Sequence, residues 1–278
     1  MKRSYLYLLL LAATCISVFA CNDPSSQQST EETPATPKIK EENVTYRSDT
    51  TTLDGYVAYD ESSDKKRPAV LVIPEWWGMV EYPKMRARQL AELGYIAMAV
   101  DMYGNGKVAD SPSAAQNSAM PFYQNPQLAK SRIDAAMAKI KSYSQTDTNN
   151  IAAIGYCFGG GMVLNAARLG EPWKGAVSFH GTLIGTPANK DLLKAKILVL
   201  HGGDDKFVSQ ADVDKFKKQM DSIGASYDLK VYPGATHAFT NPKSDETAKK
   251  FNMPIAYNAA ADTASWNEMK AFLEKVFK

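Results

Sequence analysis

Three side chains that can perform acyl-transfer chemistry stand in separate segments of the sequence: Cys157, Asp205 and His237. A thiol can attack a carbonyl carbon, an imidazole can take up the thiol proton, and a carboxylate can hold the imidazole in one tautomer. Their order along the chain, nucleophile then acid then histidine, is one in which such triads occur. The residues therefore predict a cysteine nucleophile, provided that the fold brings the three side chains together.

The cysteine occupies a segment whose pattern is typical of a sharp turn between a strand and a helix. Gly155-Tyr156-Cys157-Phe158-Gly159 follows an apolar run and leads into small residues that can open a helix. The flanking glycines relieve crowding around a nucleophile, and a helix N-terminus stabilises an anion. The backbone N–H of Phe158 is one predicted oxyanion donor. The alternatives are a buried structural cysteine and a phosphate-binding turn, although the segment lacks the Gly-Lys-Ser/Thr ending of a P-loop.

Few residues are candidates for the acid and the base. Asp205 follows an apolar run that ends at His201, and the adjacent Asp204 is the alternative acid. The chain has three histidines. His237 lies in a loop after the last predicted strand, where the acid-then-base order requires the base. His201 is expected to support the acid loop, and His180 has no companion motif.

Apolar runs rich in β-branched residues alternate with segments of helical periodicity. Several of these runs are nearly continuous, as expected for strands that are covered on both faces. The alternation predicts one α/β domain, with a mostly parallel central sheet and helices on both faces. We expect strands at 44–47, 56–59, 69–74, 96–102, 151–156, 176–179, 197–201 and 229–232, and helices at 82–93, 126–143, 160–169, 209–223 and 261–277.

The first residues carry the features of an export signal. Lys2 and Arg3 precede an apolar stretch that ends near residue 20, and a polar segment follows it. The junction Val18-Phe19-Ala20-Cys21 resembles a bacterial lipobox, and an ordinary cleaved signal peptide is the alternative. We expect export to the bacterial cell envelope, with attachment to a membrane by the lipid anchor only. The predicted parts are a lipoprotein signal peptide at 1–20, a flexible tether at 21–41 that starts from a lipidated Cys21, and a folded domain at 42–278.

The composition argues against several classes of protein. Hydrophobic residues make up 45% of the 278 residues, which is enough for one substantial core and excludes a disordered chain. The formal net charge is +2 without a basic run, so the sequence does not indicate a nucleic-acid partner. Three scattered cysteines make neither a disulfide framework nor a zinc site. We expect no metal or organic cofactor, and a small molecule as the binding partner.

Several segments of the chain resemble the dienelactone hydrolase family, whose members have the α/β-hydrolase fold. The resemblance extends over about residues 44–278, and its motifs are well separated along the chain. It implies that fold for this chain and hydrolysis of an ester or lactone. The segments that carry it are 155–160 for the nucleophile, 203–208 for the acid, 234–239 for the base, and the further stretches 72–78 and 100–104.

The resemblance also implies roles for residues that the spacing alone does not identify. Glu75 corresponds to a family glutamate that interacts with the nucleophile and helps to control its protonation. The backbone N–H of Trp76 is implied as the second oxyanion donor, in the loop that supplies this donor in the fold. Asn105 and Asn241 stand where the dienelactone-cleaving members carry arginines that hold the substrate's carboxylate. Neither asparagine can supply a cation, which argues against dienelactone as the substrate.

The resulting prediction is a hydrolase of carboxylic esters or lactones that acts through a Cys-His-Asp triad and an acyl-enzyme thioester. The alternative is a non-catalytic surface lipoprotein that binds a ligand in an inherited hydrolase pocket. The residues expected to line the substrate pocket, which would be neutral and aromatic, are Trp77, Tyr103, Asn105, Phe239 and Asn241.

Overall fold

The computed structural model describes residues 36–278. The predicted signal peptide, the predicted lipidation site at Cys21 and most of the predicted tether lie outside the described residues and stay predictions. Strand β1 begins at Ile39, so the folded part starts earlier than the predicted boundary at residue 42. The reason is that Ile39 already pairs with Asp60 on the neighbouring strand, and the side chain of Glu41 accepts a hydrogen bond from Tyr56.

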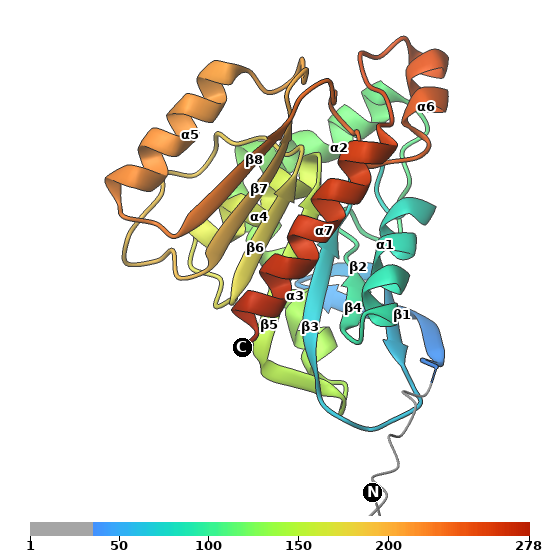
Figure 1. Cartoon of the computed structure of the whole chain (residues 1–278). Coiled ribbons are helices and arrows are strands. Elements are labelled where there is room, and N and C mark those ends of the chain that lie inside the picture. Colours follow the sequence, from blue (N-terminus) through green and yellow to red (C-terminus); the bar gives the residue numbers. More distant parts are fainter. Residues whose placement is uncertain (1–35) are drawn as a thin grey trace, which may run out of the picture. The chain divides into compact units, whose positions relative to one another are not determined.

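One sheet of eight strands forms the centre of the described part of the chain, in the order β1-β2-β4-β3-β5-β6-β7-β8 (Figure 1). β1 and β2 pair antiparallel, β2 pairs antiparallel with β4, and the pairs from β4 to β8 are all parallel. The mostly parallel sheet that the sequence predicts is therefore confirmed. The strands are β1 (Ile39–Ser48), β2 (Thr51–Asp60), β3 (Arg67–Ile73), β4 (Ile96–Ala99), β5 (Thr146–Tyr156), β6 (Gly175–Phe179), β7 (Lys196–Gly202) and β8 (Tyr227–Tyr232).

Helices cover both faces of the sheet, as Figure 1 shows. Buried side chains of α1 and α7 join one hydrophobic cluster, and those of α2, α3, α4 and α5 join the other. The two clusters form the two layers of the core on either side of the strands. The helices are α1 (Glu81–Glu92), α2 (Pro112–Gln124), α3 (Pro126–Lys141), α4 (Phe158–Arg168), α5 (Gln210–Ser222), α6 (Ser244–Phe251) and α7 (Ala259–Val276).

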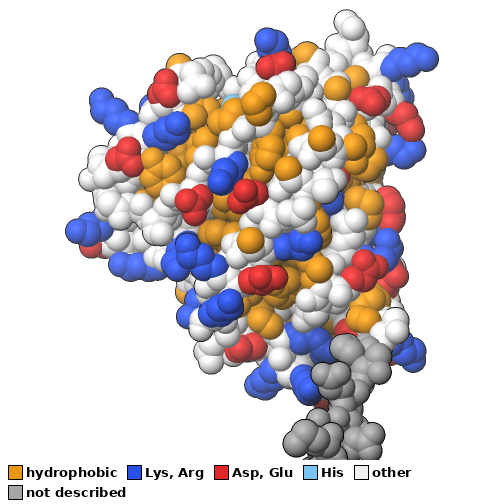
Figure 2. Space-filling model, viewed as in Figure 1, with side chains coloured by type: hydrophobic (Ala, Val, Ile, Leu, Met, Phe, Trp, Pro, Cys, Tyr) orange, Lys and Arg blue, Asp and Glu red, His pale blue; other side chains and the backbone are white. Residues whose placement is uncertain are grey.

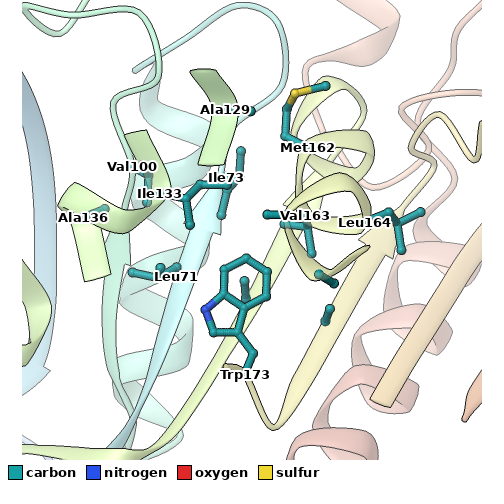
Figure 3. Packing of buried hydrophobic residues seen from close by; sticks show 14 of the residues in the cluster. Leu71, Ile73, Val100, Ala129, Ile133, Ala136, Met162, Val163, Leu164 and Trp173 are labelled. Carbon is teal, nitrogen blue, oxygen red and sulfur yellow. The ribbon is translucent and has the colours of Figure 1, made fainter. Parts of the chain in front are cut away.

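The continuous apolar runs of the central strands fill both layers at once. On β3, Leu71 and Ile73 belong to the cluster under α3 and α4, whereas Val70 and Val72 belong to the cluster under α1 and α7. Successive side chains of a strand point to opposite faces, so each residue of the run is buried. Figure 3 shows Leu71 and Ile73 packed among side chains of α3 and α4, with Trp173 beside them.

The sequence missed two helices, α2 and α6. α2 starts at Pro112 and contains Pro121, and proline inside a pattern argues against a helix. Pro112 is tolerated in the first turn, and Ala115, Ala119 and Phe122 still give α2 a buried face at helical spacing. α6 has eight residues, of which Ser244 is the buried one, so it is too short to repeat an apolar pattern over several turns.

The surface shows no dominant sign of charge on the face drawn in Figure 2, where basic and acidic side chains are interspersed. Within residues 36–278, no helix combines the length and the apolar character that crossing a bilayer requires.

Candidate active site

Cys157 lies alone between the end of β5 and the start of α4, with φ 52° and ψ −115°. A residue with a side chain adopts such a positive φ at a cost, and the surrounding structure must enforce it. A Cβ added to Gly159 would lie 2.2 Å from the carbonyl oxygen of Ile73, and one added to Gly155 would lie 2.2 Å from that of Gly159. The predicted sharp strand-to-helix turn is confirmed, and close backbone approach explains its glycines.

Asp205 and His237 meet at the carboxyl ends of neighbouring strands. Asp205 follows β7, His237 follows β8, and these strands pair in parallel. The Nδ1 atom of His237 and the Oδ2 atom of Asp205 are 2.8 Å apart. The other carboxylate oxygen accepts the backbone N–H groups of Phe207 at 2.8 Å and Val208 at 3.1 Å. Asp204 is exposed, so the carboxylate beside His237 is that of Asp205.

The bond to Asp205 leaves Nε2 of His237 available to Cys157, and both residues line the same cavity. Burial alone would lower the pKa of His237. A negative charge on the Cys157 sulfur and the hydrogen bond with Asp205 outweigh burial and raise this pKa to about 10. The imidazole therefore binds a proton more tightly when the Cys157 sulfur carries a negative charge.

Glu75 is a second buried carboxylate in the same cavity. It follows β3, is 2% exposed and accepts a hydrogen bond of 2.7 Å from Nδ2 of Asn241. Burial raises the pKa of Glu75 to about 7, against the opposing effects of the Asn241 bond and of positive charge on His237 and Arg86. A carboxyl group of this kind exchanges its proton near neutral pH. Its control over the Cys157 thiol stays a prediction.

The two predicted oxyanion donors lie on neighbouring elements. Phe158 is the first residue of α4, where backbone N–H groups have no acceptor within the helix. Trp76 lies in the turn after β3, and its carbonyl oxygen accepts a hydrogen bond of 3.0 Å from the Tyr103 hydroxyl. The close approach of Gly159 to the carbonyl oxygen of Pro74 brings this turn to the N-terminus of α4.

A cavity of about 440 Å³ opens at Cys157. Its walls are mainly aromatic and aliphatic, and the residues that line it include neither lysine nor arginine. α2 supplies one wall of the cavity. Because the sequence analysis did not predict α2, it did not predict this wall. The lining residues that sequence reasoning did not identify are Gln116, Ala119, Met120 and Tyr123 of α2, together with Thr182, Phe207, Ala238, Met253 and Ile255.

Trp77 is the one predicted pocket residue that lines this cavity. Tyr103 does not line this cavity: its ring packs against Phe158 with 5.7 Å between ring centroids, and its hydroxyl donates to the carbonyl oxygen of Trp76. Phe239 does not line it either, because it is fully buried and packs against His180. These two aromatic side chains therefore pack against residues of the site and not against the cavity.

The two asparagines also lie away from the cavity wall. Asn105 adopts φ 51° in the turn after β4, donates its backbone N–H to the carbonyl oxygen of Thr52 at 2.9 Å and is not among the residues that line the cavity. Asn241 is 8% exposed, and its side-chain amide donates a hydrogen bond to Glu75. Neither prediction of direct substrate contact is supported, although Asn241 sets the state of a carboxylate that does line the cavity.

His180 is a further residue at the site for which the sequence shows no companion motif. It directly follows β6, which pairs with the nucleophile strand β5, and this position is the signal that could have identified it. Its Nδ1 accepts the backbone N–H of Cys157 at 3.1 Å. Among residues 36–278, no group of three or more His, Cys, Asp or Glu side chains is arranged to hold a metal ion.

Known proteins share the sequence pattern. The sequence model of the dienelactone hydrolase family matches residues 53–277. A candidate carboxymethylenebutenolidase of Methylorubrum extorquens is 33% identical over 183 residues, which cover 62% of this chain and 63% of that protein. Another, of Aquifex aeolicus, is 30% identical over 198 residues, which cover 69% of this chain and 84% of that protein.

Solved structures share the architecture. A dienelactone hydrolase-like promiscuous phosphotriesterase, P91, from metagenomic libraries superposes with a TM-score of 0.80 at 29% identity, covering 86% of this chain and 99% of that chain. A candidate dienelactone hydrolase of Klebsiella pneumoniae superposes with a TM-score of 0.70 at 22% identity, covering 85% and 99% of the two chains, and supports the fold alone. The predicted α/β-hydrolase fold is thereby confirmed, and with residues 53–277 matching the family, the chain belongs to the dienelactone hydrolase family.

Proposed function

We propose that this hydrolase cleaves uncharged carboxylic esters or lactones through a Cys157–His237–Asp205 triad. The observation that carries the proposal is the His237 imidazole, held by Asp205 at 2.8 Å on one nitrogen and open to the cavity of Cys157 on the other. A carboxylate at Nδ1 fixes the tautomer in which Nε2 accepts a proton. Membership of the dienelactone hydrolase family supports hydrolysis as the reaction.

In the acylation step, Nε2 of His237 accepts the thiol proton and the Cys157 sulfur attacks the carbonyl carbon of the substrate. The π-electron pair moves to the carbonyl oxygen, which accepts hydrogen bonds from the N–H groups of Trp76 and Phe158. The carbon–oxygen bond to the leaving group then breaks. The departing alkoxide takes the proton from His237, and a thioester with Cys157 remains.

In the deacylation step, a water molecule gives a proton to Nε2 of His237 and attacks the thioester carbonyl. The second tetrahedral intermediate collapses, the carbon–sulfur bond breaks and the sulfur recovers the proton from His237. The carboxylic acid leaves the cavity. Asp205 keeps its negative charge throughout, because its hydrogen bonds hold the pKa of the carboxyl below its usual range against the effect of burial.

The chemistry of the cavity wall supports an uncharged substrate. A substrate carboxylate would enter a cavity whose lining residues offer no cationic side chain apart from His237. It would also approach Glu75, which is ionised above about pH 7. At the mouth, Met120, Tyr123 and Phe207 are 38%, 40% and 52% exposed, which provides an apolar rim for an alkyl or aryl group.

The direct test compares p-nitrophenyl butyrate with the anionic p-nitrophenyl hemisuccinate as substrates. We expect faster hydrolysis of the neutral ester and loss of turnover in Cys157→Ala. Mass spectrometry of the intact protein during turnover should show an acyl adduct on Cys157. Lys206→Ala changes an exposed side chain beside the triad acid and serves as the matched control. Equal turnover by wild type and Cys157→Ala would contradict the proposal.

A second candidate activity is hydrolysis of neutral phosphotriesters. It is motivated by the resemblance to the structure described as a promiscuous phosphotriesterase and by the uncharged cavity wall, because a triester carries no negative charge. The same sulfur would attack phosphorus and expel an aryloxide. Release of p-nitrophenolate from a dialkyl p-nitrophenyl phosphate, absent in Cys157→Ala, would support this activity, and no release above background would exclude it.

A further inference from the structure

His180 is a fully buried histidine that the proposed reaction does not use. It follows β6 and adopts φ 40°, a left-handed conformation that a side chain makes costly. Its Nδ1 atom accepts the backbone N–H of Cys157 at 3.1 Å, an N–H that also reaches the carbonyl oxygen of Phe179 at 3.0 Å. Two residues with positive φ therefore face each other through one hydrogen bond, at the turn that presents the nucleophile.

The other ring nitrogen of His180 contacts the loop that carries the base. Its Nε2 atom lies 2.7 Å from Oγ1 of Thr240, a buried residue that follows His237 in the same loop. Thr240 is itself fixed from α1, because the Tyr82 hydroxyl donates to Oγ1 at 2.6 Å and Arg86 donates to the carbonyl oxygen at 2.8 Å. The ring of His180 thus spans from the nucleophile turn to an anchored point of the base loop.

We propose that His180 is a positioning residue, whose two ring nitrogens join the backbone of Cys157 to the side chain of Thr240 and so set the distance between the Cys157 sulfur and the His237 imidazole. The proposal rests on the assignment of Cys157 and His237 as nucleophile and base. His180 does not contact the substrate cavity, whose lining residues do not include it.

The two contacts require one tautomer of a neutral ring. A nitrogen that accepts the Cys157 N–H carries no proton, so the proton of His180 is on Nε2 and is donated to Thr240. The surroundings favour the neutral state: burial lowers the pKa of His180 well below its usual range, and positive charge on His237, Arg86 and His201 acts in the same direction. The ring edge also packs against His237, with 5.3 Å between ring centroids.

The consequence is geometric. The strained backbone of Cys157 keeps its conformation only while its neighbours hold it, and His180 is the side chain that holds its N–H. Loss of His180 leaves the Cys157 N–H with the carbonyl oxygen of Phe179 but removes the link from this turn to Thr240, so the turn can shift relative to His237. A displacement of about 1 Å between reacting groups can cost about 100-fold in rate, so a residue outside the cavity can control the reaction.

Three substitutions of His180 in the full chain separate its two contacts. His180→Asn places an amide oxygen near the position of Nδ1 and keeps the acceptor for Cys157. His180→Gln places an amide nitrogen near the position of Nε2 and keeps the donor for Thr240. His180→Phe keeps the ring and loses both contacts. Val177→Ala removes core packing from the same strand without touching the bridge and is the control for lost stability.

The first readout is the second-order rate of Cys157 alkylation by iodoacetamide, followed by mass spectrometry of the peptide that contains Cys157. The second readout is kcat and KM for a p-nitrophenyl ester. We expect His180→Phe to lower the alkylation rate and kcat by about 10- to 100-fold with little change in KM. His180→Asn should retain more of both rates than His180→Gln, and Val177→Ala should lower the melting temperature and leave the alkylation rate unchanged.

Nitrogen NMR of the histidine rings supplies a third readout. We expect one buried histidine to stay neutral, with its proton on Nε2, at a pH where an exposed histidine is already protonated, and its signal to be absent in His180→Asn. Alkylation at the wild-type rate in all three variants would overturn the proposal, because His180 would then act on stability alone. If the wild type fails to turn over esters, the proposed function fails, but the order of the alkylation rates still decides the role of His180.

Discussion

The loop after β7 and the loop after β3 each place a buried carboxylate near His237, and the two carboxylates differ in protonation. Asp205 accepts hydrogen bonds from His237 and from the backbone N–H groups of Phe207 and Val208. Burial would raise the pKa of Asp205, but these bonds hold it below its usual range. The donor to Glu75 is the neutral amide of Asn241, and burial raises the pKa of Glu75 to about 7.

The difference shows that burial and the hydrogen-bond donors that oppose it together set the charge state of each carboxylate. Both side chains are shielded from water, with residue exposures of 9% for Asp205 and 2% for Glu75. Asp205 faces an imidazole and two backbone N–H groups, so its charge is stabilised and stays fixed. Glu75 has a weaker donor and titrates near neutrality. One carboxylate therefore stays charged beside His237, while the other titrates near neutrality in the cavity that Cys157 also lines.

The largest loss of activity is expected from removing the negative charge of Asp205. Asp205→Asn takes away the anion that selects the tautomer of His237, so we expect kcat for a p-nitrophenyl ester to fall by about 1,000- to 10,000-fold, as in other triads. Asp204→Asn changes the adjacent exposed carboxylate and is the matched control, with activity close to wild type. If both variants lose activity to the same degree, Asp205 is not the distinctive partner of His237.

Removing the titrating carboxylate should have a smaller, pH-dependent effect. As the pH rises through about 7, Glu75 loses its proton and becomes able to accept one from the thiol. We expect the alkylation rate of Cys157 to show an inflection near pH 7 in the wild type. Glu75→Gln should lack this inflection and lose about 10-fold in rate above pH 7, within the usual range for proton-transfer groups.

The control for this titration is Glu81→Gln, a change at an exposed glutamate on α1 that should leave the pH profile intact. An inflection that persists near pH 7 in Glu75→Gln would assign the titration to another group and contradict the prediction.

Exchanging the donor should move the titration without removing it. Asn241→Arg would place a cation beside Glu75, and an adjacent cation lowers a carboxyl pKa by about 1 to 3. The inflection in the alkylation profile should then shift from about pH 7 to a lower pH, whereas Asn241→Gln should leave it in place. Asn241 also borders a second surface cavity of about 390 Å³, which offers room for the longer side chain. An unshifted inflection in Asn241→Arg would show that this donor does not set the protonation of Glu75.

The sequence was sufficient for the sheet and for the three triad candidates. Each predicted strand overlaps an observed one, because runs such as 69–73 are apolar on both faces of the sheet and few other structures accept such a run. Cys157 was identified from glycines whose close contacts admit no side chain. These features are local, so neighbouring residues in the sequence already express them.

The pocket wall and the partners of the carboxylates could not be predicted, because they depend on contacts between distant segments. Asn241 and Glu75 are 166 residues apart in the sequence, and no local pattern joins them. Phe239 and Tyr103 follow motif residues closely, but their side chains pack behind the site. Met120 lines the cavity from α2, a helix that the sequence did not predict because it contains prolines.

A further predicted effect concerns stability and follows from the same raised pKa. The pKa of Glu75 is 4.5 in an unfolded reference and about 7 in the folded protein, so the folded state binds more protons between these values. The free energy of unfolding therefore falls as the pH rises through that window, and the full cost is present above about pH 7. Gln cannot ionise, so Glu75→Gln should gain stability relative to the wild type between pH 5 and pH 8, by about 2 to 3 kcal/mol.

Urea unfolding gives the free energy of unfolding of both proteins at pH 5 and at pH 8. The quantity compared is the stability difference between Glu75→Gln and wild type at pH 8 minus the same difference at pH 5. The contributions of all other titrating groups cancel in the comparison if their pKa values are the same in both proteins. Asp205 titrates in the opposite sense: because its pKa is lowered, its ionised form stabilises the folded state above the unfolded pKa, and this contribution is fully present at pH 8. A stability difference between Glu75→Gln and wild type that does not change from pH 5 to pH 8 would mean that Glu75 is already ionised at pH 5, and that its surroundings treat it as they treat Asp205.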